Sequence, residues 1–459
     1  MKKSLFIIAI LLIASCGKEL DINPATSVEA DQAKKSVDLL VTGAYALIGS
    51  GAGTTGPNIM EGGLYSTDLL LNADLLASED FVNWRGTFDQ YKEVSNKLMA
   101  TTNSTITRMW IKGYAAINMA NIILNDLKNV PAADQDYYKA QALFIRGIIH
   151  FELLRFWMEP STGLGVPIVT EATESFGDIK YPTRNTIADC YTAILSDLTT
   201  AKGMLGDDNG VYANEYTASA FLARVYLHQG NYASALAEAN NVIGSGKYSL
   251  VTSVEEAFNT SSSPESVFEI QQNTQNNAGT SNDGLTTFYS CDTNTPGSAG
   301  RGDIQIDQNF MDLYDAGDKR LTLLIYTGDC NKGSTTSGKW HDPYSNIPVI
   351  RLSEMYLIRA EANQRLGSNV GDDPVNDVNA IRSKANAPTY GSVTLDDILL
   401  ERELELAFEG QRIHDFKRTD KQITYKGNPL SYTAPQFILP IPQSELNTNK
   451  DIQQNTYYK

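Results

Sequence analysis

The segment LLERELELAFEGQRIHDFKR, residues 399–418, constrains the fold more than any other part of the chain, because it mixes apolar and charged residues in a way that few exposed helices do. Leu400, Leu404 and Ala407 recur at three- and four-residue steps, which is helical periodicity. Ile413, however, falls on another face of the same helix. We therefore predict a helix that neighbouring elements enclose on most sides.

The carboxylates of this segment need partners of opposite charge. Glu401, Glu405 and Glu409 form a like-charge series at four-residue spacing, which is unfavourable unless cations lie nearby. Arginines within the segment can supply part of that charge. We predict a buried ion network that fixes how helices dock. The alternative interpretation is an acid/base or metal cluster made of Glu405, Glu409, His414 and Asp415.

Length and charge limit the class of protein. A chain of 459 residues can form one large domain or two to three smaller ones, and its 42% hydrophobic and 20% charged residues are typical of a globular protein. The formal net charge of -17 makes nonspecific attraction to nucleic acid phosphates unfavourable. The acidic balance favours solubility instead.

The N-terminus predicts an exported lipoprotein. Lys2 and Lys3 precede a short apolar run, which is typical of a secretory leader and is too short to span a bilayer as a helix. The LIASC segment that follows resembles the lipobox of bacterial lipoproteins, so we expect a signal peptide over residues 1–15 and a lipid on Cys16. Several acyl chains would anchor the chain firmly, and residues 16–24 would form the tether. An ordinary cleaved leader is the alternative.

Three cysteines remain after Cys16, so at least one of them stays unpaired within the chain. Cys190 lies in a helical pattern, where a free cysteine usually acts as a small buried hydrophobe. Cys291 and Cys330 lie in loop-like sequence and can form a disulfide in an oxidising export route. The sequence leaves open whether they pair.

Helical patterns cover residues 30–47, 106–243 and 351–418. Residues 216–243 read as two short helices joined at Gly230, with small residues spaced as in tetratricopeptide repeats. Residues 355–366 and 375–385 resemble a second, looser pair. Together with residues 106–127 and 136–157, and with residues 186–205 before the 216–243 unit, the helices suffice for about four pairs in total. The sequence therefore predicts a mostly α fold in which residues 25–459 form one domain on a tetratricopeptide-like scaffold.

Residues 248–349 form a different lobe, which is rich in Ser, Thr, Asn and Gly. So long an irregular excursion from a compact domain is usually functional. Binding a neutral glycan needs aromatic faces for the sugar C–H groups, and planar amide, carboxylate or guanidinium groups for the hydroxyls. We predict ligand contacts from this lobe and from residues 64–91: Asn83, Trp84, Arg85, Tyr65, Asp68, Tyr289 and Trp340. Each aromatic residue can instead form a small core beneath its loop.

Three C-terminal segments carry a family resemblance. RLSEMYLIRAEANQRLG (351–367), ERELELAFEGQRIHDFKR (401–418) and LPIPQSELNTNKDIQQN (439–455) resemble the signatures of the SusD/RagB family of Bacteroidetes outer-membrane lipoproteins. ALFIRGIIHFELLRFW and ASAFLARVYLHQGNYASALAEANNVI, within the two middle helical segments, are similar to further parts of that family. Together with the lipobox, the resemblance covers almost the whole chain.

The resemblance implies a SusD-like fold in which tetratricopeptide-like pairs form the scaffold and variable loops form the ligand-binding surface. It further implies a lipid-anchored outer-membrane protein, exposed at the cell surface, that binds oligosaccharides without catalysis and delivers them to a SusC-like TonB-dependent transporter. Some members bind peptides, which is the first alternative. Because the 399–418 signature recurs in members with different ligands, its charges are expected to hold the C-terminal helices against Arg351, Glu354, Arg359 and Glu361.

A glycan-processing enzyme is the alternative from a different class, and the sequence offers it little support. Such an enzyme needs two carboxylates at a set separation, and abundant Asp and Glu make candidate pairs uninformative. The sequence contains no nucleophile elbow, HExxH or P-loop motif. The Asp-rich turns at Gly206 and Gly371 can hold calcium but lack the ligand series of an EF-hand. We therefore expect no cofactor and no metal.

Overall fold

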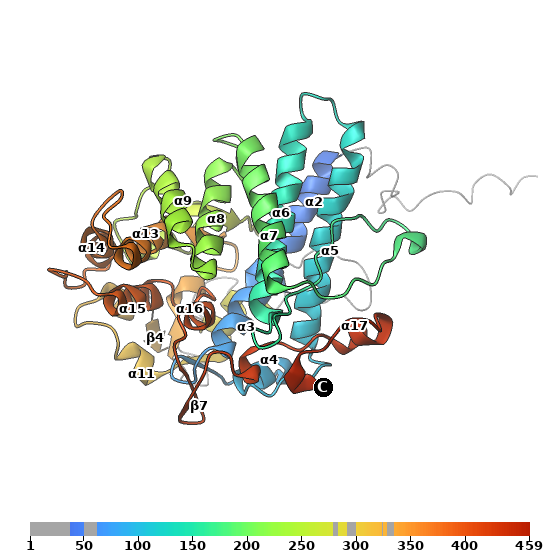
Figure 1. Cartoon of the computed structure of the whole chain (residues 1–459). Helices are drawn as coiled ribbons and strands as arrows, with labels where there is room; N and C mark the ends of the chain where they lie inside the picture. Colours follow the sequence, from blue (N-terminus) through green and yellow to red (C-terminus); the bar gives the residue numbers. More distant parts are fainter. Residues whose placement is uncertain (1–36, 50–61, 279–282, 292–299, 324, 328–334) are drawn as a thin grey trace, which may run out of the picture.

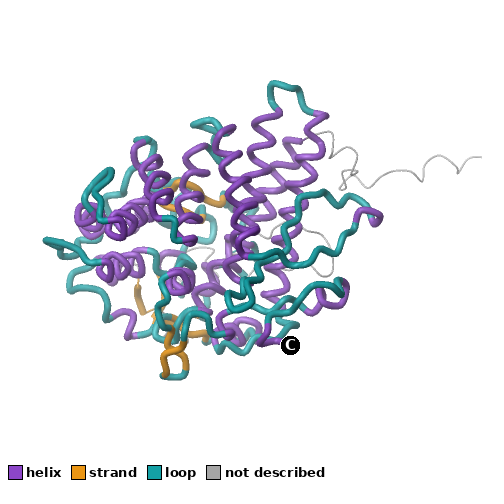
Figure 2. Tube along the Cα trace, in the orientation of Figure 1, coloured by secondary structure: helices purple, strands orange, loops and turns teal. Residues whose placement is uncertain are grey.

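The computed structural model describes residues 37–49, 62–278, 283–291, 300–323, 325–327 and 335–459 (Figure 1). Helices dominate these ranges and the strands are short, as Figure 2 shows. The predicted mostly α fold is confirmed. Among the described helices, none has the length and apolar character that crossing a membrane requires. The predicted signal peptide, Cys16 and the tether lie outside the described residues.

A row of neighbouring helices forms the scaffold, and each helix of the row packs against the next member (Figure 1). Its first members are α2 (Val37–Ile48), α5 (Ser104–Asp126), α6 (Gln135–Trp157), α7 (Ile187–Met204), α8 (Glu215–Gln229) and α9 (Tyr232–Gly244). The row continues through α13 (Leu352–Leu366), α14 (Pro374–Lys384) and α15 (Leu395–Glu405), since α13 contacts α9, α14 and α15. The expected pairs α5–α6, α8–α9 and α13–α14 are therefore present.

The turn between α8 and α9 shows how the sequence sets these helix boundaries. The side chain of Asn214 accepts a hydrogen bond from the backbone N–H of Thr217 and caps the start of α8. Gly230 ends α8 in the left-handed conformation, with φ 74°. Asn231 then caps α9 by accepting a hydrogen bond from Ser234. The predicted joint at Gly230 is confirmed.

The rest of the molecule consists of loops, short helices and two-stranded antiparallel sheets. The sheets pair β1 (Val82–Trp84) with β3 (Ile304–Ile306), β2 (Ser266–Ile270) with β6 (Ile347–Arg351), β4 (Ile325–Thr327) with β5 (Thr335–Ser337), and β7 (Ile423–Tyr425) with β8 (Asn428–Leu430). The short helices are α3 (Leu69–Leu76), α4 (Asp89–Ser95), α10 (Leu285–Tyr289), α11 (Gln308–Met311), α12 (Lys319–Leu323), α16 (Arg412–Arg418) and α17 (Gln443–Thr448). A π-helical turn, Leu64–Asp68, leads into α3.

The prediction of one continuous helix over residues 399–418 is wrong. Helix α15 ends at Glu405 and α16 begins at Arg412. Between them Phe408 and Gly410 both have left-handed backbones, with φ of 66° and 70°. A Cβ at Gly410 would lie 2.8 Å from the Cα of Leu70, so α3 approaches this turn too closely for a side chain.

The predicted ion network is confirmed in this broken segment. Glu401 contacts Arg320 at 2.6 Å and Arg382 at 2.9 Å, and Glu409 contacts Arg351 at 2.7 Å. The remaining pairs join Glu405 to Lys384 at 2.7 Å, to Arg351 at 3.1 Å and to Arg320 at 3.3 Å, and Glu409 to Lys339 at 2.7 Å. Burial opposes ionisation of Glu405, but these cations outweigh it and hold its pKa well below the usual value.

Most of the contacts expected between residues 399–418 and the neighbouring C-terminal helices are present. Glu361 pairs with Arg418 at 2.6 Å, and Glu354 lies 3.7 Å from Arg402. Arg359 is an exception, because it pairs with Asp377 of α14 at 2.5 Å rather than with residues 399–418. The charges of the segment therefore hold helices together, and the alternative of an acid/base cluster has no support from these contacts.

The cysteines differ in state. Cys190 is free and fully buried in α7, as predicted for a small hydrophobe. Cys291 is disulfide-bonded. Cys330 lies outside the described residues, so the predicted identity of the partner stays a prediction.

Candidate ligand-binding site

Tyr65 and Asp68, predicted as ligand contacts, are buried and have internal partners. The hydroxyl of Tyr65 donates to Glu152 at 3.1 Å. The carboxylate of Asp68 accepts from Arg108 Nε at 2.6 Å and from its Nη2 at 2.5 Å. Neither side chain has a face left for a ligand, so both predictions are wrong for the described conformation.

Tyr289 and Trp340 are likewise part of the interior. Tyr289 is fully buried in α10 and donates to Asp74 at 2.5 Å. The indole Nε1 of Trp340 donates to the carbonyl of Phe408 at 2.9 Å. Both side chains support the turn at Phe408 instead of offering an exposed aromatic face, so these two predictions are also wrong.

Trp84 lies in β1 with only 9% of its surface exposed. Its ring packs 4.9 Å from Tyr91 and 5.4 Å from Phe288, which matches the alternative of a small core beneath a loop. The neighbouring Arg85 is exposed, and Asn83 is half-buried and donates to the carbonyl of Glu79 at 3.0 Å. Contacts of Arg85 and Asn83 with a ligand stay a prediction.

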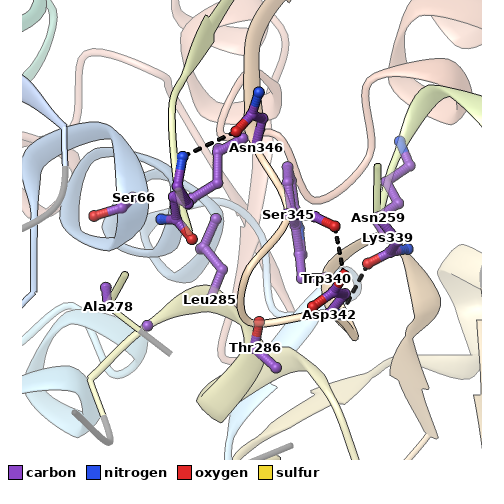
Figure 3. A pocket seen from close by; sticks show the side chains of 13 residues that line it. Ser66, Asn259, Ala278, Leu285, Thr286, Lys339, Trp340, Asp342, Ser345 and Asn346 are labelled. Atoms are coloured by element: carbon purple, nitrogen blue, oxygen red, sulfur yellow. Dashed lines mark hydrogen bonds between the residues drawn. The ribbon is translucent and has the colours of Figure 1, made fainter. Parts of the chain in front are cut away.

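Figure 3 shows a narrow crevice beside Trp340, lined by polar side chains including Asn259, Asp342, Ser345 and Asn346. Most of these groups already bond one another: Ser345 donates to Asp342 at 2.6 Å, for example. The crevice has a volume of about 10 Å³, which is at the limit for a single water molecule. A sugar ring does not fit in it.

A wider groove, which we call the tyrosine groove, consists of two adjoining hollows of about 170 and 290 Å³. The two hollows share Val211, Tyr212, Glu269 and Gln271. Further lining residues come from the end of α2, from the turns that flank α8 and α9, from β2 and from the loop after β2: Tyr45, Asn214, Tyr248, Ser266, Phe268 and Asn276. The groove therefore lies where the scaffold meets the loop-rich lobe.

Two tyrosine rings of this groove are held at a fixed angle. The centroids of Tyr45 and Tyr212 are 4.9 Å apart with their planes tilted by 53°. The hydroxyl of Tyr45 donates to Gln141 and accepts from the backbone of Ala213, and burial raises its pKa far above the usual value. The hydroxyl of Tyr212 lies 2.9 Å from that of Thr42. Their half-buried rings are thus preorganised as aromatic walls.

Polar groups line the groove between the rings. Asn214 donates to the Tyr248 hydroxyl at 3.1 Å, and Glu269 accepts from Asn346 at 2.6 Å. Ser266 Oγ is buried and has no hydrogen-bond partner among the described residues. Glu269 is the one charged side chain among the described lining residues, and burial raises its pKa. Aromatic faces with hydroxyl and amide groups suit a neutral polar ligand better than an ion.

None of the groove tyrosines was predicted from the sequence, because each lies at a helix end or in a turn far from the others along the chain. Tyr45 belongs to α2, Tyr212 precedes α8 and Tyr248 follows α9. The residues that flank them in the sequence carry no shared signal: Tyr45 and Tyr212 have apolar neighbours on both sides. Only the packing of the scaffold brings them together.

Comparison with known proteins agrees with this architecture. A family profile described as "SusD family" matches residues 329–458, and one described as "Starch-binding associating with outer membrane" matches residues 67–227. The chain belongs to the SusD/RagB family. The two profiles overlap both the scaffold and the C-terminal ion network of this SusD-like chain.

Relatives of the SusD/RagB chain span its whole length. It is 23% identical to the SusD-like protein P38 of Formosa agariphila, over 99% of this chain and 98% of the relative. It is 24% identical to the starch-binding protein SusD of Bacteroides thetaiotaomicron, over 97% and 96% of the two chains. A solved SusD superfamily structure from the latter organism matches with a TM-score of 0.78 and 25% identity, covering 92% of this chain and 99% of that one.

Proposed function

We propose that the protein is a cell-surface lipoprotein that binds an oligosaccharide and delivers it to a SusC-like TonB-dependent transporter in the outer membrane. Membership of the SusD/RagB family supports a role in nutrient capture. The predicted lipid on Cys16 would hold the protein at the membrane, and its function needs no covalent chemistry. The ion-paired state of Glu401, Glu405 and Glu409 is consistent with a structural use of these carboxylates.

The observation that carries the ligand class is the tyrosine groove. Its walls are aromatic rings and its polar groups are mainly hydroxyls and amides, which match the alternating C–H and O–H surfaces of a sugar. Covering one tyrosine face contributes about 1.5 to 3 kcal/mol, so two or three rings give modest affinity after the costs of ordering the ligand. Modest affinity suits a protein that must release its ligand to a transporter.

The ligand class is tested by calorimetry with a panel of neutral oligosaccharides and peptides of matched size. The soluble form, which lacks residues 1–16, suits this experiment because the described fold begins at Val37. We expect heat of binding from at least one oligosaccharide series and no cleavage products afterwards. Binding of peptides but of no oligosaccharide would show that the ligand is a peptide. Cleavage of a glycan with turnover would contradict the non-enzymatic function.

The transporter partnership needs a separate experiment. The full chain, expressed in its native membrane with an affinity tag, is expected to retain a TonB-dependent barrel during mild detergent purification. A tagged outer-membrane lipoprotein of unrelated fold is the matched control. Recovery of the protein without any barrel, under conditions that keep other membrane complexes intact, would contradict the delivery step.

A further inference from the structure

A separate cavity of about 270 Å³ lies where the C-terminal ends of α6 and α8 meet the start of α7 and helix α16. It shares no lining residue with the tyrosine groove. An engineered protein cavity of roughly 150 Å³ binds benzene, so this one has room for an aromatic ring and a polar group. The proposed oligosaccharide site does not use it, and the ion network borders it through Arg418.

One side of this cavity is apolar and reaches the surface. Tyr191 and Ile438 are buried in its wall, whereas Ile187 and Tyr432 are half-buried nearer the opening. Pro160 is exposed at the rim. An apolar ligand body can therefore enter from solvent and lie against these side chains.

The buried side of the cavity carries an amine without a counter-charge. Lys417 is 8% exposed, and its Nζ donates to the carbonyl of Arg155 at 3.2 Å. No carboxylate among the described residues lies within ion-pair distance of it. Burial, with a smaller contribution from Arg155, lowers its pKa to about 7. A buried ammonium of this kind gains most from an anion placed beside it.

The nearby carboxylates are already occupied. Glu152 pairs with Arg155, and Asp415 pairs with Arg418 at 2.6 Å and with Arg402 at 3.2 Å. The protein therefore supplies cations to this wall but no spare anion among its described residues.

His414 adds a second polar group to the same wall. It is 1% exposed, its ring packs 4.9 Å from Phe156, and its Nε2 is buried with no hydrogen-bond partner in the described part of the chain. Burial and the neighbouring cations, Arg155 first among them, hold its pKa well below the usual value. A neutral imidazole still offers one N–H donor to a ligand oxygen.

We propose that this cavity binds a small monocarboxylate with an apolar body, whose carboxylate lies beside Lys417 and His414 and whose body lies against Tyr191 and Ile438. The ligand supplies the anion that the described residues do not. The site is independent of the oligosaccharide groove, so either can exist without the other.

The test uses three probes of similar shape and different charge: benzoate, benzamide and benzylammonium. Each is titrated into the soluble form and followed by ligand-observed NMR. Benzoate is expected to bind at least about tenfold more tightly than benzamide, since a charged hydrogen bond contributes about that factor. Benzylammonium is expected not to bind. Equal affinity for benzoate and benzamide would overturn the proposal.

Variants locate the site. Lys417→Met should weaken benzoate binding about tenfold or more, whereas Lys202→Met, which removes a lysine paired with Glu238 at 2.7 Å elsewhere, should leave it unchanged. Unchanged binding in a folded Lys417→Met protein would overturn the proposal. If that variant fails to fold, a second variant, Ile187→Trp, takes its place. Its larger side chain narrows the opening of the cavity from a half-buried position, so benzoate should no longer bind. Persistence of benzoate binding in this variant would overturn the proposal. Tyr212→Ala should not affect benzoate binding.

Discussion

Replacing Glu409 with alanine should destabilise the whole fold. Its carboxylate accepts from Arg351 at 2.7 and 2.9 Å and from Lys339 at 2.7 Å, and all three side chains are buried. After the substitution Arg351 keeps Glu265 and Glu405, whereas Lys339 keeps only a backbone carbonyl, 2.8 Å away, among its described acceptors. Removing one partner of a buried pair costs about 3 to 5 kcal/mol. Burial already lowers the pKa of Lys339, which allows it to lose its proton and favours the lower end of that range.

The free energy of unfolding of Glu409→Ala is measured by urea denaturation followed by circular dichroism. Asp207→Ala is the control, because it breaks an exposed pair with Lys247 and should cost less than about 1 kcal/mol. Adding Lys339→Met to Glu409→Ala removes the uncompensated ammonium, so the double variant should be more stable than Glu409→Ala alone. A loss below about 1 kcal/mol for Glu409→Ala, or a stable variant that has lost only its ligand, would refute the structural interpretation.

Three further predictions concern pH, the turn and the anchor. Nearby cations hold the folded-state pKa of Glu405 below its unfolded value. The stability that this ionised carboxylate contributes is therefore present above about pH 4.5 and is lost as pH falls through the lowered pKa. Urea denaturation between neutral and acid pH measures this loss. Gly410→Ala should lower the free energy of unfolding by more than about 1 kcal/mol in the same assay. Gly203→Ala, at an exposed helical site with open space around it, should leave that free energy unchanged or raise it. Equal losses in the two variants would contradict the close approach of α3. Cys16→Ser should abolish incorporation of labelled palmitate, and continued labelling would show that the lipid is attached elsewhere.

The sequence predicts the scaffold well, for physical reasons that particular residues illustrate. Glycine at position 230 and Asn214 set helix boundaries locally, so their effects follow from the chain itself. The series Glu401, Glu405 and Glu409 requires buried cations wherever this segment packs, which is why the sequence predicts an ion network around it. The break at Phe408 could not be predicted, because contacts with α3 and Trp340, both distant in the sequence, hold that turn.

The ligand-contacting residues are harder to predict, because an aromatic residue in a loop serves equally well as a core for that loop. Trp84 and Tyr289 illustrate this, since both pack inward against other rings. The tyrosine groove shows the converse: Tyr45, Tyr212 and Tyr248 come from distant parts of the chain, and only tertiary packing brings them to one surface.

The central claim is that the tyrosine groove binds an oligosaccharide, and calorimetry of groove variants tests it most directly. With the oligosaccharide that binds best to the unmodified protein, Tyr212→Ala and Tyr248→Ala should each weaken affinity about tenfold, because each removes roughly 1.5 kcal/mol of aromatic contact. The control Tyr181→Ala, at a ring that is 54% exposed outside the groove, should bind as tightly as the unmodified protein. Unchanged affinity in both groove variants, with all proteins folded, would contradict the claim.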